Sequence, residues 1–494
     1  MMERLQLPIT AFIDPIGTNR HEIEALAQQV LTRLLTHLSY AGDRSALPSW
    51  KESPLPAEIE IANFASIPDL PVEAALLLDQ LDQILAASMN AANPRYIGHM
   101  DSMPTTFSMF GDLIASAINN NMLSVEMSPV FSRLEPLLLK QFAAIFGLGE
   151  SAGGVLLSGG TLANLQALAV ARNIKFQALQ KGIVGLDKQP VLFASEVAHT
   201  SLQKAAMLLG LGTDAVIRVP INQNSQMSIA ALQEQIERAI DAGQEPFCVV
   251  ATAGTTTTGN IDPINEIYQI AQAHQLWFHV DAAYGGALMF SPQYCQKLTG
   301  IENADSITFN PQKWLYVAKT CVMILFKHFS SLKTAFQIQA PYMKSAADLT
   351  NLGEISVQGT RHADVLKLWL SMQHLGRHSY AQLINESYRL TQFFVEEISK
   401  RSFLELASLP EMNIICFRGV PVHVAPEHWD NWNTKLQTYL GRTQNTFLSL
   451  PLYQGQRWLR AVLLNPYTDQ TQILELFEAV DTFFSCNYKS GEHP

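Results

Sequence analysis

Apolar residues recur every three or four positions in two segments near the N-terminus, 21–38 and 72–88. This spacing places the apolar side chains on one face of a helix, so we predict an amphipathic helix in each segment. The proline- and serine-rich stretch 45–56 between them is typical of a loop. The segment 1–90 is too thin to build a core of its own, so we expect it to pack on the main body of the chain or on a second subunit.

From about residue 150 to 330, short apolar runs alternate with helical stretches. Runs that are apolar throughout are expected of strands that are covered on both faces. The repeated order of strand, helix and strand predicts an α/β fold with a mostly parallel, seven-stranded sheet. The runs are GVLL (154–157), VLFAS (191–195), AVIRV (215–219), FCVVAT (247–252), WFHVD (277–281), SITF (306–309) and CVMILF (321–326).

A long helical segment, 363–376, follows the last of these runs and leads into a tail that mixes strands with helices. Such a mixture is typical of a smaller α+β domain. We therefore predict three parts: an N-terminal helical segment over 1–90, a large domain over 91–370 and a small C-terminal α+β domain over 371–494.

The composition restricts the possible partners of the chain. Its 494 residues carry a net charge of −11, which argues against nucleic acid and against an anionic membrane surface as partners. The longest apolar stretches are far shorter than a membrane span. The five cysteines are widely spaced and form no cluster with histidine, so we expect free thiols and no metal site. The N-terminus lacks the design of a signal peptide, and we expect a cytoplasmic enzyme.

In an open α/β sheet, ligands bind beyond the carboxyl ends of the strands, so the residues after each run are the candidates for a site. Gly160 and Thr161 follow the first run and open a helix, where backbone N–H groups suit a phosphate. An ordinary turn that binds no ligand would explain Gly160 and Thr161 equally well. His199 follows the second run and could stack on a flat ligand, act as an acid or base, or have no task. The threonines 255–258 after the fourth run suit ligand contacts or a polar turn.

Asp281 closes an otherwise apolar strand, which is unfavourable unless the carboxylate is paired. A protonated ring nitrogen is one good partner, and a structural cap is the alternative. Lys313 follows the sixth run beside Trp314, where desolvation lowers the pKa of a lysine and makes its amine nucleophilic, although most lysines are solvated surface charges. A phosphate turn, a histidine, threonines, an aspartate and a lysine together are the groups that pyridoxal 5'-phosphate (PLP) requires. We therefore predict a PLP enzyme with a Schiff base at Lys313.

At these residues the chain resembles the group II PLP-dependent amino-acid decarboxylases. This family, which has the aspartate-aminotransferase-like PLP fold type I, includes glutamate, cysteine-sulfinate, 2,4-diaminobutyrate and aromatic amino-acid decarboxylases. The resemblance covers about 90–470 and is most specific at HVDAAYGG (279–286) and ADSITFNPQKW (304–314). The segment 93–131 is nearest to the glutamate-decarboxylase branch.

The resemblance implies roles for individual residues. Lys313 forms the Schiff base, Asp281 bonds the pyridine nitrogen and His199 stacks on the ring. Arg460 holds the α-carboxylate of the substrate, and His99 contributes to substrate selection. The resemblance also implies a homodimer with active sites at the interface. The cofactor-binding residues that it implies are Gly160, Thr161, His199, Thr252, Asp281, Ala283, Asn310, Gln312 and Lys313.

Two positions depart from the family pattern. The histidine that precedes the lysine in the family is Gln312 here, whose amide can still donate to a phosphate. The family's mobile loop carries a tyrosine that returns a proton to the substrate carbon, whereas the corresponding segment 343–358 has none and Tyr342 lies at its entrance. His199, or a water that it orients, is then the expected donor.

Taken together, these features predict decarboxylation of an L-amino acid to its amine and CO2. The expected substrate is acidic or short and polar: glutamate, aspartate, cysteine sulfinate or 2,4-diaminobutyrate. Three alternatives stay open: an aromatic amino-acid decarboxylase, an oxidative decarboxylase that forms an aldehyde, and a non-catalytic protein of the same fold.

Overall fold

The computed structural model describes residues 7–47, 65–341 and 350–489. The chain divides into two compact units, and each is built from segments that are distant in the sequence. The larger unit comprises Met100–Val420 and Pro451–Leu464, and the smaller unit comprises Met1–His99, Pro421–Leu450 and Asn465–Pro494. The predicted division into three consecutive parts remains a prediction.

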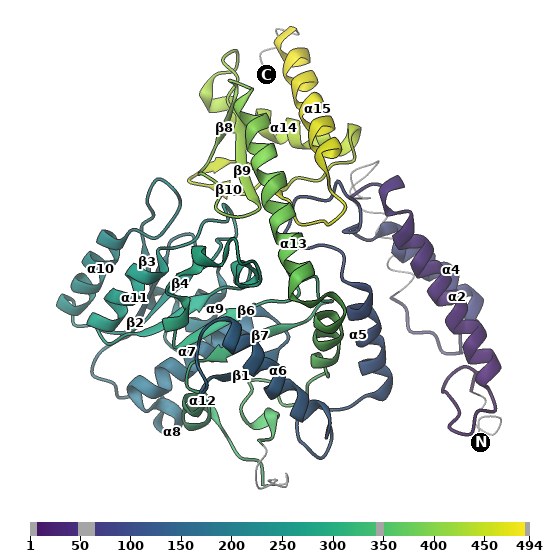
Figure 1. The fold of residues 1–494 in the computed structure, drawn as a ribbon, viewed down its shortest axis with the longest axis horizontal. Coiled ribbons are helices and arrows are strands. Elements are labelled where there is room, and N and C mark those ends of the chain that lie inside the picture. Colours follow the sequence, from purple (N-terminus) through teal and green to yellow (C-terminus); the bar gives the residue numbers. More distant parts are fainter. Residues whose placement is uncertain (1–6, 48–64, 342–349, 490–494) are drawn as a thin grey trace. The chain divides into compact units, whose positions relative to one another are not determined.

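A seven-stranded sheet forms the centre of the larger unit, in the order β1-β7-β6-β5-β4-β2-β3 (Figure 1). Neighbouring strands run parallel except β7, which is antiparallel to both β1 and β6. Each of the seven predicted apolar runs overlaps one strand of this sheet. The strands are β1 (Gly153–Leu157), β2 (Pro190–Ser195), β3 (Val216–Val219), β4 (Glu245–Thr252), β5 (Trp277–Asp281), β6 (Ser306–Phe309) and β7 (Val322–Phe326).

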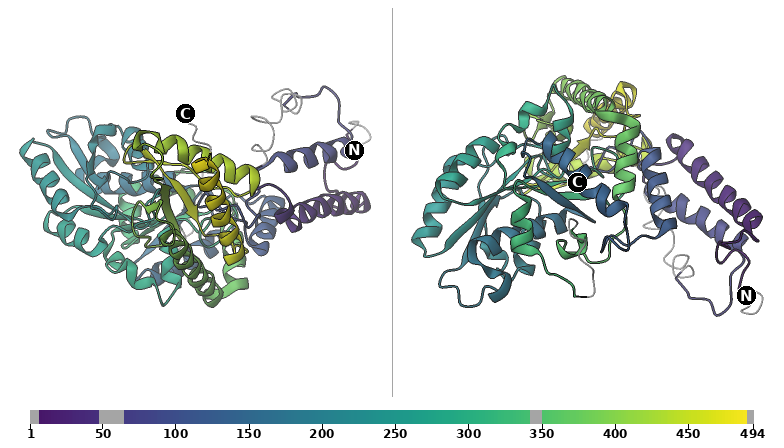
Figure 2. Two further views of the ribbon diagram at one scale, coloured as in Figure 1. Left: turned by 90° about the horizontal axis from the view of Figure 1, so that it is seen from above. Right: turned by 60° about the horizontal axis from the view of Figure 1, so that its bottom comes forward.

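The alternation of side chains along β4 shows why its sequence is apolar throughout. Cys248 and Val250 belong to the apolar cluster that includes Leu202 of α9. Val249 belongs to a second cluster, which includes Ile267 of α11. Successive side chains of a strand point to opposite faces, so both faces of the sheet are buried beneath helices. Figure 2 shows this layering.

The helices of the larger unit connect and cover the strands. They are α5 (Thr106–Ile118), α6 (Phe131–Ile145), α7 (Gly160–Phe176), α8 (Ala178–Lys181), α9 (Ser201–Leu208), α10 (Ile229–Asp241), α11 (Ile264–Ala273), α12 (Phe329–Phe336) and α13 (Val365–Ser399). Short 3-10 turns are η3 (Thr213–Ala215), η4 (Gly285–Phe290), η5 (Cys295–Leu298), η6 (Ile301–Asn303) and η7 (Leu352–Glu354).

Helix α13 is broken at Gly376, where the backbone has φ 63° and ψ 169°. A residue with a side chain is strained at such a positive φ, whereas glycine adopts it freely. The chain continues as a helix beyond this break to Ser399 and then enters a small antiparallel sheet in the order β12-β9-β8. Its strands are β8 (Leu404–Leu406), β9 (Ile414–Gly419) and β12 (Leu459–Val462), and β10 (Leu452–Tyr453) pairs with β11 (Gln456–Arg457).

The smaller unit is mainly helical. The two predicted N-terminal helices are present as α2 (Arg20–Ser39) and α4 (Ala74–Ala87), which pack on each other. Its other elements are α14 (Trp429–Thr443), α15 (Gln470–Lys489), η1 (Ala41–Asp43) and η8 (Pro426–His428). Among the residues that the structure describes, no helix has the length and apolar character needed to cross a membrane.

Candidate active site

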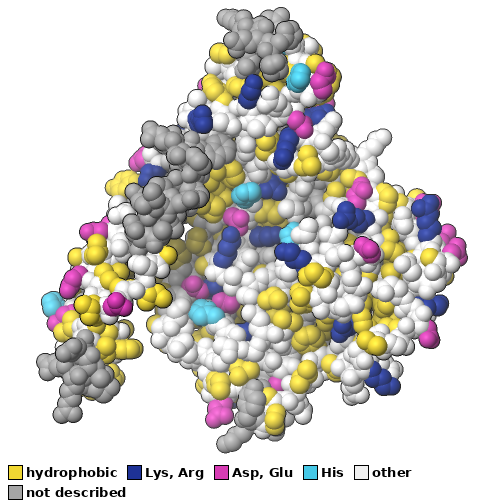
Figure 3. Space-filling model, turned by 180° about the vertical axis from the view of Figure 1, so that it is seen from behind, with side chains coloured by type: hydrophobic (Ala, Val, Ile, Leu, Met, Phe, Trp, Pro, Cys, Tyr) yellow, Lys and Arg dark blue, Asp and Glu magenta, His cyan; other side chains and the backbone are white. Residues whose placement is uncertain are grey.

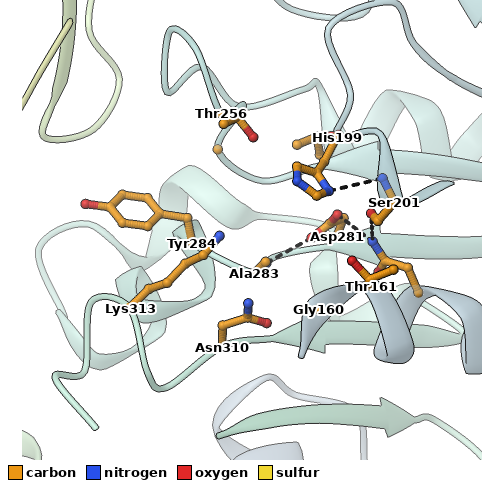
Figure 4. A pocket seen from close by; sticks show the side chains of 13 residues that line it. Gly160, Thr161, His199, Ser201, Thr256, Asp281, Ala283, Tyr284, Asn310 and Lys313 are labelled. Carbon is orange, nitrogen blue, oxygen red and sulfur yellow. Dashed lines mark hydrogen bonds between the residues drawn. The ribbon is translucent and has the colours of Figure 1, made fainter. Parts of the chain in front are cut away.

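A cavity of about 180 Å³ lies at the carboxyl ends of the parallel strands in the larger unit (Figure 4). Thr252 ends β4 and Asp281 ends β5, so both open into this cavity. The fold thus brings together side chains that are up to about 150 residues apart in the sequence. The predicted residues that line it are Gly160, Thr161, His199, Thr252, Asp281, Ala283, Asn310 and Lys313.

Asp281 is 6% exposed and is held from two sides. Its Oδ1 accepts a hydrogen bond of 3.1 Å from the backbone N–H of Ala283, and its Oδ2 accepts one of 2.9 Å from Asn164 Nδ2. A carboxylate offers about four acceptor sites, so these two bonds orient it and leave acceptor capacity for a ligand in the cavity. A cationic ring nitrogen would be a suitable partner for such a buried carboxylate.

The imidazole of His199 has a defined tautomer. The backbone N–H of Ser201 donates to His199 Nδ1 at 3.2 Å, so Nδ1 is the acceptor and the proton of the neutral ring is on Nε2. Desolvation lowers the pKa of His199, Asp281 opposes this shift and Lys313 adds to it. The ring is therefore neutral at pH 7 and presents one N–H donor.

Lys313 reaches into the cavity from the side opposite His199 (Figure 4). Its Nζ lies 3.9 Å from Met100 Sδ, and a thioether is only a weak acceptor. Burial lowers the pKa of the Lys313 amine, and Asp281 acts in the opposite direction. A lowered pKa increases the share of uncharged amine, which is the nucleophilic form.

The opening of α7 is suited to a phosphate group. The helix begins at Gly160, and the first backbone N–H groups of a helix lack intrahelical acceptors. A Cβ atom at Gly160 would lie 3.1 Å from Asn310 Nδ2, so a side chain would crowd this corner of the cavity. Thr252 Oγ1 and Asn310 Oδ1 are buried without a hydrogen-bond partner among the described residues. Buried polar atoms of this kind are expected where a ligand completes the site.

Gln312 does not line the cavity. Its Oε1 accepts a hydrogen bond of 2.7 Å from the backbone N–H of Cys321, so the amide braces the loop that carries Lys313. Arg460 is 7% exposed, and its Nη1 donates to the carbonyl oxygen of Thr256, which does line the cavity.

His99 belongs to the smaller unit, where its ring centroid lies 5.1 Å from that of Phe447. Residues 342–349 are outside the described residues. They include Tyr342 and the first part of the loop 343–358, whose sequence has no tyrosine. Beyond it, Gln358 Oε1 accepts a hydrogen bond of 3.0 Å from the backbone N–H of Ser158.

The sequence reasoning did not single out Asn164, Ser201 or Tyr284, which also line the cavity. Asn164 lies in a mostly apolar stretch of α7, where a polar residue at a helix position expected to be buried is the one signal for it, and Gln166 gives the same signal. Tyr284 donates to Asn413 Oδ1 at 2.8 Å, and its ring centroid lies 5.0 Å from that of Trp314. It therefore forms a rigid wall beside Lys313.

A second group of polar side chains lies elsewhere in the larger unit. Asp112, His362 and Asp364 each offer one atom that could bind a metal ion, and these three atoms lie within 4.8 Å of one another. The ammonium group of Lys367 is 2.8 Å from a carboxylate oxygen of each aspartate. This lysine contacts both carboxylates, and His362 Nδ1 lies 3.0 Å from Asp364, so the arrangement is explained as an ion-pair network.

On the face shown in Figure 3, acidic and basic side chains are interspersed with apolar ones. Such a mixed surface, on a chain with net charge −11, differs from the basic stripe that binds nucleic acid.

Comparisons with known proteins agree with this geometry. Residues 58–420 match the pyridoxal-dependent decarboxylase conserved domain. The acidic amino acid decarboxylase of Xenopus tropicalis is 31% identical over 464 residues, which are 90% of this chain and 89% of the relative. The cysteine sulfinic acid decarboxylase of Mus musculus is 33% identical over 416 residues, which are 83% of this chain and 82% of the relative.

Solved structures give the same result. The crystal structure of mouse CSAD has a TM-score of 0.88 and 29% identity, and the match covers 95% of this chain and 99% of that one. The mostly parallel seven-stranded sheet and this match confirm the predicted PLP fold type I. The Asn310 amide N–H, the buried Thr252 hydroxyl and the N–H groups at the opening of α7 are donors that suit the phosphate of PLP, which is the cofactor. The chain therefore belongs to the family of pyridoxal-dependent decarboxylases, enzymes that use PLP to remove a carboxyl group from an amino acid.

Proposed function

We propose that this protein decarboxylates an acidic or short polar L-amino acid to its amine and CO2, with glutamate, aspartate, cysteine sulfinate and 2,4-diaminobutyrate as the candidate substrates. The observation that carries the proposal is the single cavity that both Lys313 and Asp281 line. The relatives named for acidic amino acids and cysteine sulfinic acid, at 31% and 33% identity, support the substrate class.

When bound, PLP supplies an aldehyde that combines with amines and a ring that withdraws electrons from the bond to be broken. Lys313 supplies the amine that holds the cofactor and, after the reaction, displaces the product. The lowered pKa of Lys313 supports this role because the uncharged amine is the reacting form. Asp281 keeps a proton on the ring nitrogen, and its two protein hydrogen bonds hold it ready for that task.

The remaining residues bind and orient. Gly160, Thr161, Asn310 and Gln312 are proposed to hold the phosphate, and Thr252 and Ala283 to lie against the cofactor. His199 is proposed to stack on the ring, where its neutral imidazole presents Nε2–H and avoids repulsion with a protonated ring nitrogen. Gln312 can donate to the phosphate only through its Nε2, because its Oε1 already accepts from the backbone N–H of Cys321.

Arg460 is proposed to bind the α-carboxylate of the substrate. Its guanidinium is buried and is held by the carbonyl of Thr256, a residue of the cavity wall. A guanidinium presents several N–H donors in one plane, a geometry that matches the two oxygens of a carboxylate. His99 is proposed to contribute to the choice of side chain.

Two variants test the assignment. In Lys313→Ala the visible absorption of the protein-bound cofactor should be lost together with turnover, whereas Lys297→Ala, which changes an exposed lysine of η5, should retain both. In Asp281→Ala turnover should fall by orders of magnitude because the ring loses its proton partner. Normal turnover in either active-site variant would refute the assignment. Measuring CO2 release for the four candidate substrates and for aromatic amino acids then identifies the substrate class.

The absence of a tyrosine from 343–358 favours a second candidate reaction, oxidative decarboxylation to an aldehyde. In the non-oxidative reaction a proton must return to the substrate carbon, and His199, or a water that it orients, is the proposed donor. Quantifying amine against aldehyde and peroxide decides between the two reactions. A protein that binds no PLP and releases no CO2 from any amino acid would instead support the non-catalytic alternative.

We propose that the enzyme is a homodimer with active sites at the interface. Helix α5 carries an exposed apolar stripe at helical spacing, Phe107, Phe110, Ile114 and Ile118, with exposed fractions of 40% to 47%. On the adjoining face Gly111 allows close approach to α13, because a Cβ there would lie 2.6 Å from Lys367 Cα. A stripe of this kind suits a second copy of the chain. Light scattering should give a dimer for the wild type and a monomer for Phe110→Asp with Ile114→Asp.

A cytoplasmic location is proposed on the state of the thiols. The five cysteines are free, and three of them, Cys248, Cys321 and Cys416, are buried. Free buried thiols are typical of a reducing compartment. Fractionation of cells that express the tagged protein would test the location.

A further inference from the structure

Asn164 is the centre of a buried hydrogen-bond network behind the cavity. The residue is 1% exposed and lies in the second turn of α7. Its Nδ2 donates to Asp281 Oδ2 at 2.9 Å and to Ser201 Oγ at 2.9 Å. The Asn164 amide therefore contacts two groups. One is the Asp281 carboxylate, the proposed partner of the ring nitrogen, and the other is Ser201, which bonds the proposed stacking residue His199.

The orientation of this amide is fixed from its other end. Asn164 Oδ1 accepts from Thr308 Oγ1 at 2.7 Å, and His279 Nε2 lies 3.2 Å from the same oxygen. Both N–H groups of the amide are thus occupied, and its oxygen accepts from Thr308. A flipped amide would place its oxygen against the Asp281 carboxylate, which can only accept, so a single orientation is compatible with the neighbours.

His279 is held against Ser306 on the far side of the amide. Its Nδ1 lies 3.1 Å from the Ser306 backbone carbonyl and 2.9 Å from Ser306 Oγ, which also accepts from Trp277 Nε1 at 2.9 Å. A carbonyl can only accept, so the proton of the neutral ring is on Nδ1. Burial lowers the pKa of His279 to about 4, so the ring is neutral at pH 7 and packs beside the Asn164 amide as an uncharged group.

A second branch of the network leads to His199. The hydroxyl of Ser201 accepts from Asn164, and the backbone N–H of Ser201 donates to His199 Nδ1 at 3.2 Å. The amide therefore holds the residue that fixes the tautomer of His199. The two groups proposed to meet the cofactor ring, Asp281 and His199, are both positioned through one side chain.

We propose that Asn164 is a positioning residue for the cofactor ring, and that Thr308 locks its amide so that Asp281 is held in a single orientation. This inference rests on the proposed role of Asp281 and adds residues to that role. Loss of the Asn164 amide leaves Asp281 Oδ2 without its charge-assisted donor in a buried site, so the carboxylate becomes a weaker partner for a ring-nitrogen proton.

The test uses holoenzyme reconstituted with PLP that carries an isotopically labelled ring nitrogen, observed by NMR. In Asn164→Leu the ring-nitrogen resonance should move from the protonated towards the neutral position. The kcat should fall about tenfold to a hundredfold while KM changes little. Thr308→Val removes this lock and keeps the amide, so it should move the resonance in the same direction by less. This milder change provides the readout if Asn164→Leu does not fold.

Asn173→Leu is the matched control. Asn173 is buried in the same helix, 7% exposed, and its Nδ2 donates to the carbonyl of Ala335 rather than to Asp281. It should lose stability as Asn164→Leu does but keep the wild-type resonance. If Asp281→Asn moves the resonance and neither Asn164→Leu nor Thr308→Val does, the inference about Asn164 is wrong and the role of Asp281 stands. If Asp281→Asn leaves the resonance in place, the proposed role of Asp281 itself fails.

Discussion

Gln312 and Cys321 form a double contact across the connection between β6 and β7. Gln312 Oε1 accepts from the backbone N–H of Cys321 at 2.7 Å, and the backbone N–H of Gln312 donates to the Cys321 carbonyl at 3.4 Å. Lys313 directly follows Gln312. The Gln312 amide, at the position where the family has a histidine, therefore closes the loop that carries Lys313.

Gln312→Ala should destabilise this loop. The N–H of Cys321 is buried, and losing its acceptor leaves an unsatisfied donor, a loss of about 1–3 kcal/mol. We expect a lower thermal unfolding midpoint and faster loss of PLP on dilution. Gln296→Ala, at an exposed position in η5, is the control. A Gln312→Ala protein that unfolds and releases PLP like the wild type would contradict the bracing role.

Gly160→Ala should weaken cofactor binding. The added Cβ would lie 3.1 Å from Asn310 Nδ2, so it would displace the amide from the corner proposed to hold the phosphate. We expect the dissociation constant of PLP to rise about tenfold, measured by fluorescence titration of the apoprotein. Gly159→Ala is a matched control, because a Cβ at the preceding glycine meets no atom within 4 Å and φ there is −176°. Equal effects of the two substitutions would contradict the prediction.

Arg460→Lys should lower kcat/KM for the preferred amino acid by about tenfold to a hundredfold, mainly through KM. A lysine keeps the charge but cannot hold the carbonyl of Thr256 and a carboxylate in the same plane. Arg457→Lys changes an exposed arginine of β11 and should leave both constants unchanged. An unchanged KM in Arg460→Lys would refute the assignment of Arg460 to the α-carboxylate.

His279 should make the apoprotein less stable in acid. Burial lowers its pKa in the folded protein from 6.5 to about 4, so the unfolded chain binds more protons between these values and stability falls as the pH falls through this range. The contribution is on the order of 3 kcal/mol at most. Asp262 acts in the opposite direction, since burial raises its pKa from 3.8 to about 7.

The contribution of His279 is therefore measured as a difference. The thermal midpoint of the wild type minus that of His279→Gln should decrease as the pH is lowered from 6.5 towards 4, because the variant has no titrating group at this position. A difference that does not change with pH would show that His279 keeps its ordinary pKa in the folded protein.

The strands of the large sheet could be predicted because each is a continuous apolar run that ends in polar residues. Asp281 and Lys313 could be singled out from the same pattern, because Asp281 ends an apolar strand and Lys313 follows four residues after another. Asn164 could not, because its significance depends on partners far along the chain, such as Asp281 and Thr308. Local patterns carry no information about which of these side chains meet.

The hydrogen bond by which Gln312 braces the Lys313 loop could not be predicted from the sequence either. The resemblance implied a contact with phosphate from its position beside the lysine, whereas its partner in the structure is the backbone of Cys321, which any residue type could provide. Similarly, the antiparallel direction of β7 follows from how the chain returns after Lys313, and the apolar run itself is the same for either direction.

In the sheet, β1 is the edge strand beside β7, although the two are separated by most of the larger unit in the sequence. During synthesis, β1 and the glycine turn that opens α7 emerge early, but the neighbour that completes the pairing emerges only after Lys313. A nascent chain that ends before Cys321 therefore has neither a finished sheet edge at the phosphate corner nor a braced lysine. We therefore expect the chain to capture PLP late in its maturation, once Cys321 and the strand that follows it have been made.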